Sequence, residues 1–192
     1  RNHKIKYFLS HKKENIDVLL HWCLEGKQSA QLEVYNRYYK AMYNTALRIV
    51  KDSMEAEDVM QESFLSAFTK LDSYKGEVSF GAWLKRIVVN NSIQQYRKQQ
   101  KNNTVEINEV LYKVEDANGV DLNDGRTGQK AQKVLETMKT LKDSYRISLT
   151  LFLIEGYDYE EIGQIMNLSY ASCRTMISRA KESLRNKMLI AQ

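Results

Sequence analysis

The sequence predicts an all-α protein of two small helical domains joined by a flexible acidic linker, the second domain containing a helix-turn-helix. Its 192 residues include no proline and only eight glycines, so few positions would break a helix. Apolar residues recur at helical spacing on both sides of a polar, non-periodic segment. Charge divides similarly. Basic residues exceed acidic ones by five in residues 1–100 and by two in residues 131–192, whereas acidic residues exceed basic ones by two in residues 101–130.

Residues 31–101 are predicted to form the first domain, built from three helices. In the first, apolar residues recur at helical spacing from Leu32 to Val50. The second follows Asp52, which resembles a capping pair with Glu55 three residues later. A loop with two glycines, residues 72–82, separates it from the third, whose first inward residue is a tryptophan.

The linker is predicted at residues 102–130, where helical periodicity is lost and Asn, Asp and Gly gather. Residues 1–30 precede the first domain as an extension that includes the start of the first helix. Residues 131–192 form the second domain, where apolar residues return at helical spacing.

Composition also predicts what the protein lacks. The two cysteines lie far apart with no metal-ligand spacing, which indicates reduced thiols and neither a metal site nor a cofactor. No stretch approaches the roughly 20 apolar residues of a membrane span. We therefore expect a soluble, cytoplasmic protein with basic lobes that suit a polyanion such as nucleic acid.

A helix-turn-helix is predicted near the C-terminus. Asp158 with Glu161 is a capping signal for a short helix. Gly163 supplies a small residue for close contact, Asn167 begins a tight turn, and Ser169 caps the next helix. In this arrangement the second helix enters the DNA major groove.

The second helix has two contrasting sides. An apolar stripe repeats at steps of four and three from Cys173 to Met188. Short hydroxyls and arginines occupy the other side and can enter a groove or donate to guanine and phosphate. The predicted duplex-reading residues are Ser172, Arg174, Thr175, Ser178 and Arg179. The alternative is an ordinary solvated surface.

Three motifs resemble one family in order and separation. They are "AEDVMQESFLSAF", "SFGAWLKRIVVNNSIQQYRK" and "YDYEEIGQIMNLSYASCRTMISRAKESLR", and together they look like a bacterial RNA polymerase sigma factor of the extracytoplasmic-function group. The resemblance implies an initiation factor that binds core RNA polymerase, recognises a minus-35 element as duplex and melts a minus-10 element. It implies no enzymatic activity, because nucleotidyl transfer belongs to the polymerase.

The resemblance also implies a polymerase-binding surface on the second helix. In the family this helix docks on the clamp helices of the largest subunit, and the flap region is a further contact. Four polar residues match: Glu55, Asp58, Gln61 and Glu62. A charged face suits a partner that must later be released.

Binding single-stranded DNA requires rings for stacking and cations for phosphates. The loop and third helix supply both. The rings are Tyr74, Phe80 and Trp83, and the cations are Lys75, Lys85, Arg86, Arg97 and Lys98. By resemblance this region melts the minus-10 element and holds a flipped base with Asn90. Phe80 and Trp83 have a competing interpretation as core residues.

Three residues depart from the family pattern. Val89 stands where a polar or basic residue is frequent, Gln94 where Asp is common, and Met176 where the recognition helix often has Arg. Fewer phosphate contacts would weaken promoter binding and its salt dependence. Recruitment by another DNA-bound factor is therefore a hypothesis, as is control by an anti-sigma factor.

Two alternative functions remain open. One is a two-domain helix-turn-helix regulator that binds duplex DNA only. The other is a metal-dependent hydrolase built on Glu55, Asp58 and Glu62. Outward carboxylates on an amphipathic helix, with no converging histidine, argue against the second.

Overall fold

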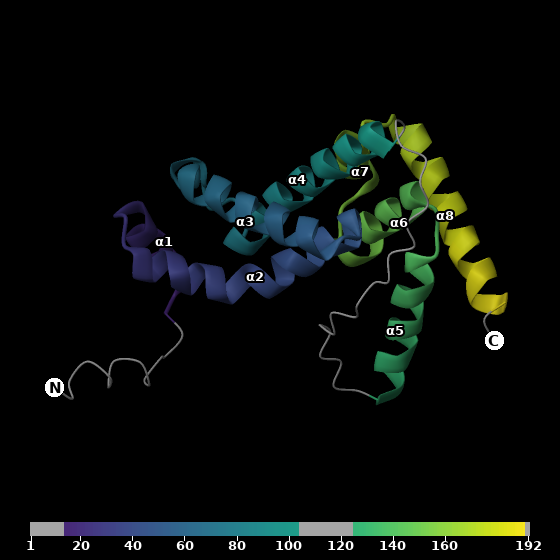
Figure 1. The fold of residues 1–192 in the computed structure, drawn as a ribbon, viewed down its shortest axis with the longest axis horizontal. Helices are drawn as coiled ribbons and strands as arrows, with labels where there is room; N and C mark the ends of the chain where they lie inside the picture. Colours follow the sequence, from purple (N-terminus) through teal and green to yellow (C-terminus); the bar gives the residue numbers. More distant parts are fainter. Residues whose placement is uncertain (1–13, 104–124, 191–192) are drawn as a thin grey trace.

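The computed structural model describes residues 14–103 and 125–190, and every regular element within them is helical (Figure 1). The N-terminal lobe comprises α1 (Ile16–Leu24), α2 (Gln28–Val50), α3 (Ser53–Thr69), the 3-10 turn η2 (Leu71–Ser73) and α4 (Phe80–Asn103). The C-terminal lobe comprises α5 (Gly125–Lys139), α6 (Asp143–Leu149), the π-helical turn η3 (Thr150–Ile154), α7 (Tyr159–Met166) and α8 (Tyr170–Ile190). The predicted all-helical fold is confirmed.

The start of the N-terminal lobe differs from the prediction. Helix α1 was not predicted; it begins after Asn15, whose side chain accepts a hydrogen bond from the backbone of Asp17 at 3.1 Å. Helix α2 then starts at Gln28, inside the predicted extension of residues 1–30, which was expected to include the start of this helix. Helix α4 starts at Phe80, because the Ser79 hydroxyl accepts from the Ala82 amide and caps the helix inside the predicted loop.

The predicted linker, residues 102–130, is shorter than expected at both ends. Helix α4 continues to Asn103 and α5 begins at Gly125. The prediction placed these boundaries where helical periodicity was lost and Asn, Asp and Gly gathered, residues that are poor helix formers. Residues 104–124 lie outside the described residues, as do residues 1–13.

The N-terminal lobe is held by an apolar core between α2, α3 and α4, with α1 covering part of it. Burying one large apolar side chain contributes about 1.5–3 kcal/mol, so a core of this size fixes the relative positions of the helices. Its most buried members include Val34, Ala46, Ala56, Phe64, Leu84 and Val88.

The C-terminal lobe contains the predicted helix-turn-helix. Asp158 and Glu161 form a capping box at the start of α7, and Asn167 ends it in the left-handed conformation. The Leu168 amide donates to the Gly163 carbonyl at 2.8 Å. A Cβ on Gly163 would lie 2.9 Å from the Leu168 carbonyl oxygen, so only glycine fits this turn without a backbone shift. The local prediction is confirmed.

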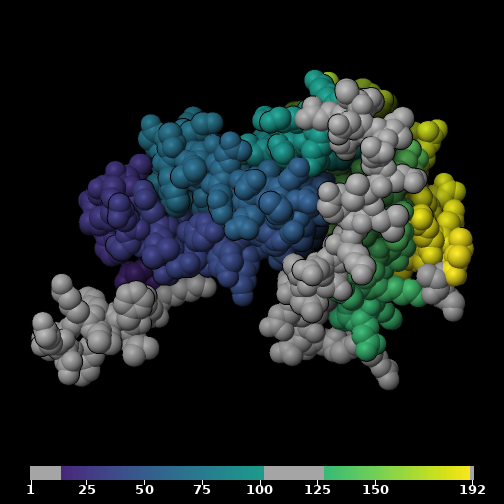
Figure 2. Space-filling view, in the orientation of Figure 1, coloured from purple at the N-terminus to yellow at the C-terminus, as the bar shows by residue number. Residues whose placement is uncertain are grey.

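The two lobes pack directly against each other (Figures 1 and 2). Ile49 at the end of α2, with Val89 and Ile93 of α4, belongs to the same buried apolar cluster as residues of α6, η3, α7 and α8. Ile49 and Val89 have no exposed surface. The lobes therefore share a core in addition to being connected along the chain.

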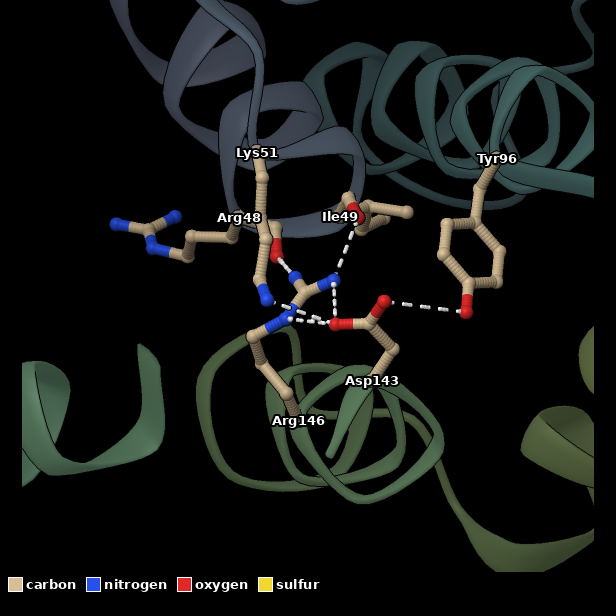
Figure 3. Close-up of polar contacts among 6 residues, drawn as sticks. All are labelled: Arg48, Ile49, Lys51, Tyr96, Asp143 and Arg146. Carbon is tan, nitrogen blue, oxygen red and sulfur yellow. Dashed lines mark hydrogen bonds and ion pairs between the residues drawn. The ribbon is translucent and has the colours of Figure 1, made fainter. Parts of the chain in front are cut away.

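A polar cluster flanks this shared core (Figure 3). The Arg146 guanidinium of α6 donates to the carbonyls of Arg48 and Ile49 at the end of α2. The last carbonyls of a helix have no partner within it, so Arg146 satisfies them from the other lobe. Asp143 lies 3.2 Å from Arg146 and 2.8 Å from the Lys51 ammonium. The Tyr96 hydroxyl of α4 donates to the same carboxylate at 3.4 Å.

Candidate nucleic-acid interface

The outer face of α8 presents all five residues predicted to read duplex DNA. The exposed residues are Ser172, Arg174, Thr175, Ser178 and Arg179. The opposite side is buried in the C-terminal lobe through Cys173, Ile177, Ala180 and Leu184. The amphipathic division predicted for this helix is confirmed. Its polar face is therefore accessible to a DNA groove.

Several of these side chains are held by their own helix. The Ser169 hydroxyl donates to Ser172 Oγ at 2.8 Å and accepts from the Ser172 amide at 3.2 Å. Thr175 donates to the Ala171 carbonyl at 2.9 Å. The Arg174 guanidinium lies 5.9 Å from the centre of the Tyr170 ring. Such contacts already restrict these side chains before binding, so less conformational entropy is lost when they bind.

A hollow lies beside the recognition face, between the start of α6 and α8. Sequence reasoning identified its α8 wall, Ser172, Thr175 and Arg179, but not the residues opposite. Those are Lys142, Ser144 and Tyr145, and the Lys142 ammonium lies 3.9 Å from the Tyr145 ring centre. Only spatial proximity reveals them, because roughly thirty residues separate the two walls. A cation and two hydroxyls at this edge suit a DNA phosphate.

The predicted stacking rings form a single aromatic cluster. Tyr74 lies 5.3 Å from Trp83 and 5.7 Å from Phe80, and Phe80 lies 5.4 Å from Tyr38 between ring centres. The Tyr74 hydroxyl donates to the Val78 carbonyl at 2.6 Å and closes the loop. Phe80 is only 2% exposed, so its ring offers no face to a base and supports the cluster from within. Tyr74 and Trp83 are half-buried.

The predicted cations of this lobe fall into two groups. Those exposed without contacts to the other lobe include Lys75 and Lys98, with Asn90 also exposed. Lys85 instead lies 3.3 Å from the Glu155 carboxylate and donates to the Glu155 carbonyl. Arg97 donates to the Ile165 carbonyl at 3.2 Å. The C-terminal lobe therefore occupies part of the predicted single-strand surface.

The charge of Arg86 also reaches the C-terminal lobe. The pKa of Tyr157 is raised to about 12, chiefly by burial and also by the charge of Glu155, while the charge of Arg86 acts to lower it. Arg86 thus lies close enough to Tyr157 to influence its ionisation, although its side chain remains exposed.

The predicted polymerase face on α3 is only partly solvent-exposed. Asp58, Gln61 and Glu62 are exposed. Glu55 is half-buried in the first turn, where its amide is capped by Asp52 and one carboxylate oxygen has no hydrogen-bond partner. Two large apolar side chains that sequence reasoning missed, Met54 and Leu65, are 76% and 68% exposed. With Asp58 and Gln61 they follow helical spacing along one side of α3.

The described part of the chain holds no group of three or more His, Cys, Asp and Glu side chains placed to bind a metal ion. Within that same part, no helix has the length and apolar character needed to cross a membrane. Cys23 and Cys173 are both unpaired and buried, and burial raises the pKa of each thiol.

Two family models match the chain, one in each lobe. Sigma-70 region 2 matches residues 34–102, and Sigma-70 region 4 matches residues 131–184. A curated relative, the ECF RNA polymerase sigma-E factor of Salmonella typhimurium, is 30% identical over 182 residues that cover 89% of this chain and 93% of the relative. The chain belongs to the ECF sigma factors of the sigma-70 family.

Other proteins are also similar to this chain, in sequence or in fold. The ECF sigma factor SigW of Bacillus subtilis is 28% identical over 85% of this chain and 91% of its own length. The sigma factor RpoE of Bartonella quintana, solved in complex with the anti-sigma factor NepR, has a TM-score of 0.55 at 22% identity, covering 83% of this chain and 97% of that one. CnrH, solved in complex with the cytosolic domain of CnrY, has a TM-score of 0.54 at 22% identity, covering 93% of this chain and 99% of that one.

The three atypical residues of this sigma factor occupy different environments. Val89 is completely buried in the apolar cluster shared by the lobes. Gln94 is exposed on α4. Met176 is half-buried and lines the hollow beside the recognition face. The apolar character of Val89 therefore has a packing reason within this chain.

Proposed function

We propose that this sigma factor binds core RNA polymerase and directs it to a promoter, reading a duplex minus-35 element with α8 and opening a minus-10 element with the Tyr74 to Asn90 region. One observation carries the proposal: a polar face of short hydroxyls and arginines lies exposed on the second helix of a helix-turn-helix. This is the face that such motifs insert into the major groove.

The proposed partners follow from the other surfaces. The exposed acids of α3, flanked by Met54 and Leu65, offer polar and apolar contacts for the clamp helices of the polymerase. Tyr74 and Trp83, beside Lys75, offer stacking and charge to a separated strand. An anti-sigma factor is a further proposed partner, supported by the complex of the similar Bartonella sigma factor. The chain carries out no chemistry itself and acts in the cytoplasm with the polymerase.

The test is run-off transcription with purified core polymerase on a promoter library. Transcripts from promoters that share an upstream and a downstream element are expected only when this chain is present. Gel shifts distinguish a sigma factor from the remaining alternative, a regulator that binds duplex DNA only. Such a regulator would bind its site tightly without polymerase. Tight binding alone, with no transcript from any promoter, would contradict the proposal.

The variant Arg174→Ala tests the reading face directly. Loss of a bidentate base contact should weaken use of the upstream element by about 1–3 kcal/mol and relax sequence preference at one position. Arg185→Ala is a matched control, since Arg185 is exposed on the same helix and lies about 16 Å further from its N-terminal, base-contacting end. Equal effects of both variants would remove Arg174 from the reading face.

A further inference from the structure

A ladder of three aromatic rings runs from η3 to the first residue of α8, and its members are Phe152, Tyr159 and Tyr170. The rings of Phe152 and Tyr159 stack with their centres 5.1 Å apart and their planes 22° from parallel. Tyr159 then meets the Tyr170 ring edge-on at 6.1 Å. At the other end the Lys181 ammonium lies 4.1 Å from the Phe152 ring centre. Because each ring comes from a different element, the aromatic ladder restrains the Tyr170 ring relative to the C-terminal lobe.

Tyr170 remains 55% exposed although it belongs to the aromatic ladder. Its ring lies at the N-terminal end of the recognition helix, the part of a helix-turn-helix that approaches the DNA bases. Sequence reasoning did not select it, because it belongs neither to the apolar stripe that begins at Cys173 nor to the hydroxyls and arginines of the polar face. Part of the ring can therefore contact a neighbouring side chain of α8.

Arg174 is this neighbour. It follows Tyr170 by four residues, the spacing at which side chains meet on a helix. Its guanidinium lies 5.9 Å from the Tyr170 ring centre, within the range of a cation–π contact. An exposed arginine otherwise populates many rotamers. A restrained ring that attracts the cation reduces the number of rotamers occupied before DNA binds.

The orientation of this guanidinium matters more for choosing a base than for holding a phosphate. A bidentate contact with guanine requires two N–H groups aligned with the N7 and O6 acceptors. A phosphate positions the protein without reporting sequence. A residue that restricts the Arg174 guanidinium is therefore expected to affect sequence preference.

We propose that Tyr170 is a positioning residue for Arg174 and thereby sets specificity at the base that Arg174 reads. Tyr159 supports the Tyr170 ring, so a side chain outside the reading face also contributes to this specificity. The inference rests on the proposed function, because it assumes that Arg174 contacts a base of the upstream element.

The first measurement is the ¹⁵N relaxation of the Arg174 Nε–H group in the full chain, its signal assigned by its loss in Arg174→Ala. Tyr170→Leu keeps an apolar side chain but removes the ring, so the order parameter should fall. Tyr170→Phe keeps the ring and should preserve it. The Arg185 Nε–H group, exposed eleven positions further along α8, should be unaffected by either variant.

The second measurement is run-off transcription by the full chain with core polymerase on promoters whose upstream element is randomised. Its readout is the preference ratio for the favoured base at the position where Arg174→Ala relaxes selection. Tyr170→Leu should lower this ratio about two- to fivefold, the range expected for an exposed cation–π contact. Tyr170→Phe should retain the ratio. Tyr159→Leu, which removes the ring beside Tyr170, should lower it less.

Double variants show whether Tyr170 acts through Arg174. In an Arg174→Ala background, Tyr170→Leu should have no further effect, because the group that it positions is gone. In an Arg179→Ala background its effect should persist, since Arg179 lies about 13 Å along the helix from Tyr170. An equally large loss of promoter use in the Arg174→Ala background would mean that Tyr170 contacts DNA itself, which overturns the positioning role.

The remaining outcomes separate this inference from the proposed function. An unchanged Arg174 order parameter in Tyr170→Leu overturns the inference and leaves the proposed function standing. A lower order parameter with an unchanged preference ratio also overturns it. The absence of any transcript with the unaltered chain would contradict the proposed function and the specificity role with it. The relaxation data would then still decide whether the Tyr170 ring restrains Arg174.

Discussion

The outer face of α8 and the middle of α4 carry similar polar and basic side chains, but their surroundings differ. On α8 all five predicted residues face solvent. On α4, Lys85 and Arg97 are hydrogen-bonded to the C-terminal lobe. A face suited to a nucleic acid is therefore also suited to acidic and carbonyl groups of its own chain. Whether such a face is free depends on tertiary contacts.

The largest expected effect is a loss of stability when one buried charge between the lobes, the Arg146 guanidinium, is removed. Arg146→Ala leaves the Arg48 and Ile49 carbonyls and the Asp143 carboxylate without this donor. Removing one partner of a buried charged cluster costs about 3 kcal/mol, so the urea midpoint should fall markedly. Arg185→Ala, at an exposed position, should change the free energy of unfolding by less than about 0.5 kcal/mol and so leave the midpoint almost unchanged. Similar midpoints for the two variants would show that Arg146 does not hold the lobes.

A smaller effect distinguishes two helical glycines, one in each lobe. In Gly163→Ala the added methyl meets the Leu168 carbonyl oxygen at 2.9 Å, so the backbone of the helix-turn-helix must shift at a cost of about 2 kcal/mol. In Gly81→Ala the methyl meets Tyr38 Cε1 at 3.0 Å, and that ring can move. We expect a cost below about 1 kcal/mol there. Thermal unfolding of both variants measures the difference, and a larger loss for Gly81→Ala would contradict this account.

The helix-turn-helix could be predicted from sequence because its determinants are local. Asp158, Glu161 and Gly163 act within six residues of one another, and their spacing is visible in the chain. The short helix α1 was missed because its nine residues give too few apolar repeats to stand out. Its boundary signal, Asn15, was overlooked.

The contact between the lobes could not be predicted in the same way. Glu155 and Arg48 are 107 positions apart, and no periodicity in a single sequence pairs them. Only Val89 gave a signal, as an apolar residue where the family often has a polar one, and the structure buries it in the shared cluster. The burial of Phe80 similarly depends on Tyr38 of α2. Residue types indicated the chemistry of the site but not which side chains are accessible.

The smallest effect concerns the pH dependence of the Asp143 cluster, the polar contact at one end of the lobe interface. Burial acts to raise the pKa of Asp143, but the hydrogen bond from Lys51 and the charge of Arg146 outweigh it and hold the pKa below its ordinary value of 3.8. A carboxyl with a lowered pKa in the folded state stabilises that state above its ordinary pKa. The contribution is lost as the pH falls through the lowered value.

This prediction is measured as the difference in unfolding free energy between the unaltered chain and Asp143→Asn. The difference should be constant above about pH 5 and should shrink as the pH falls below about 4, because both chains then carry a neutral side chain. Asp72→Asn is the control: Asp72 is exposed in η2, which packs against α1 and α3 of its own lobe, so its difference should stay near zero throughout. A difference for Asp143→Asn that grew on acidification would mean that the carboxylate is less stable in the folded chain than in the unfolded one. The ion pairs that join α6 to α2 would then not stabilise the packing of the two lobes.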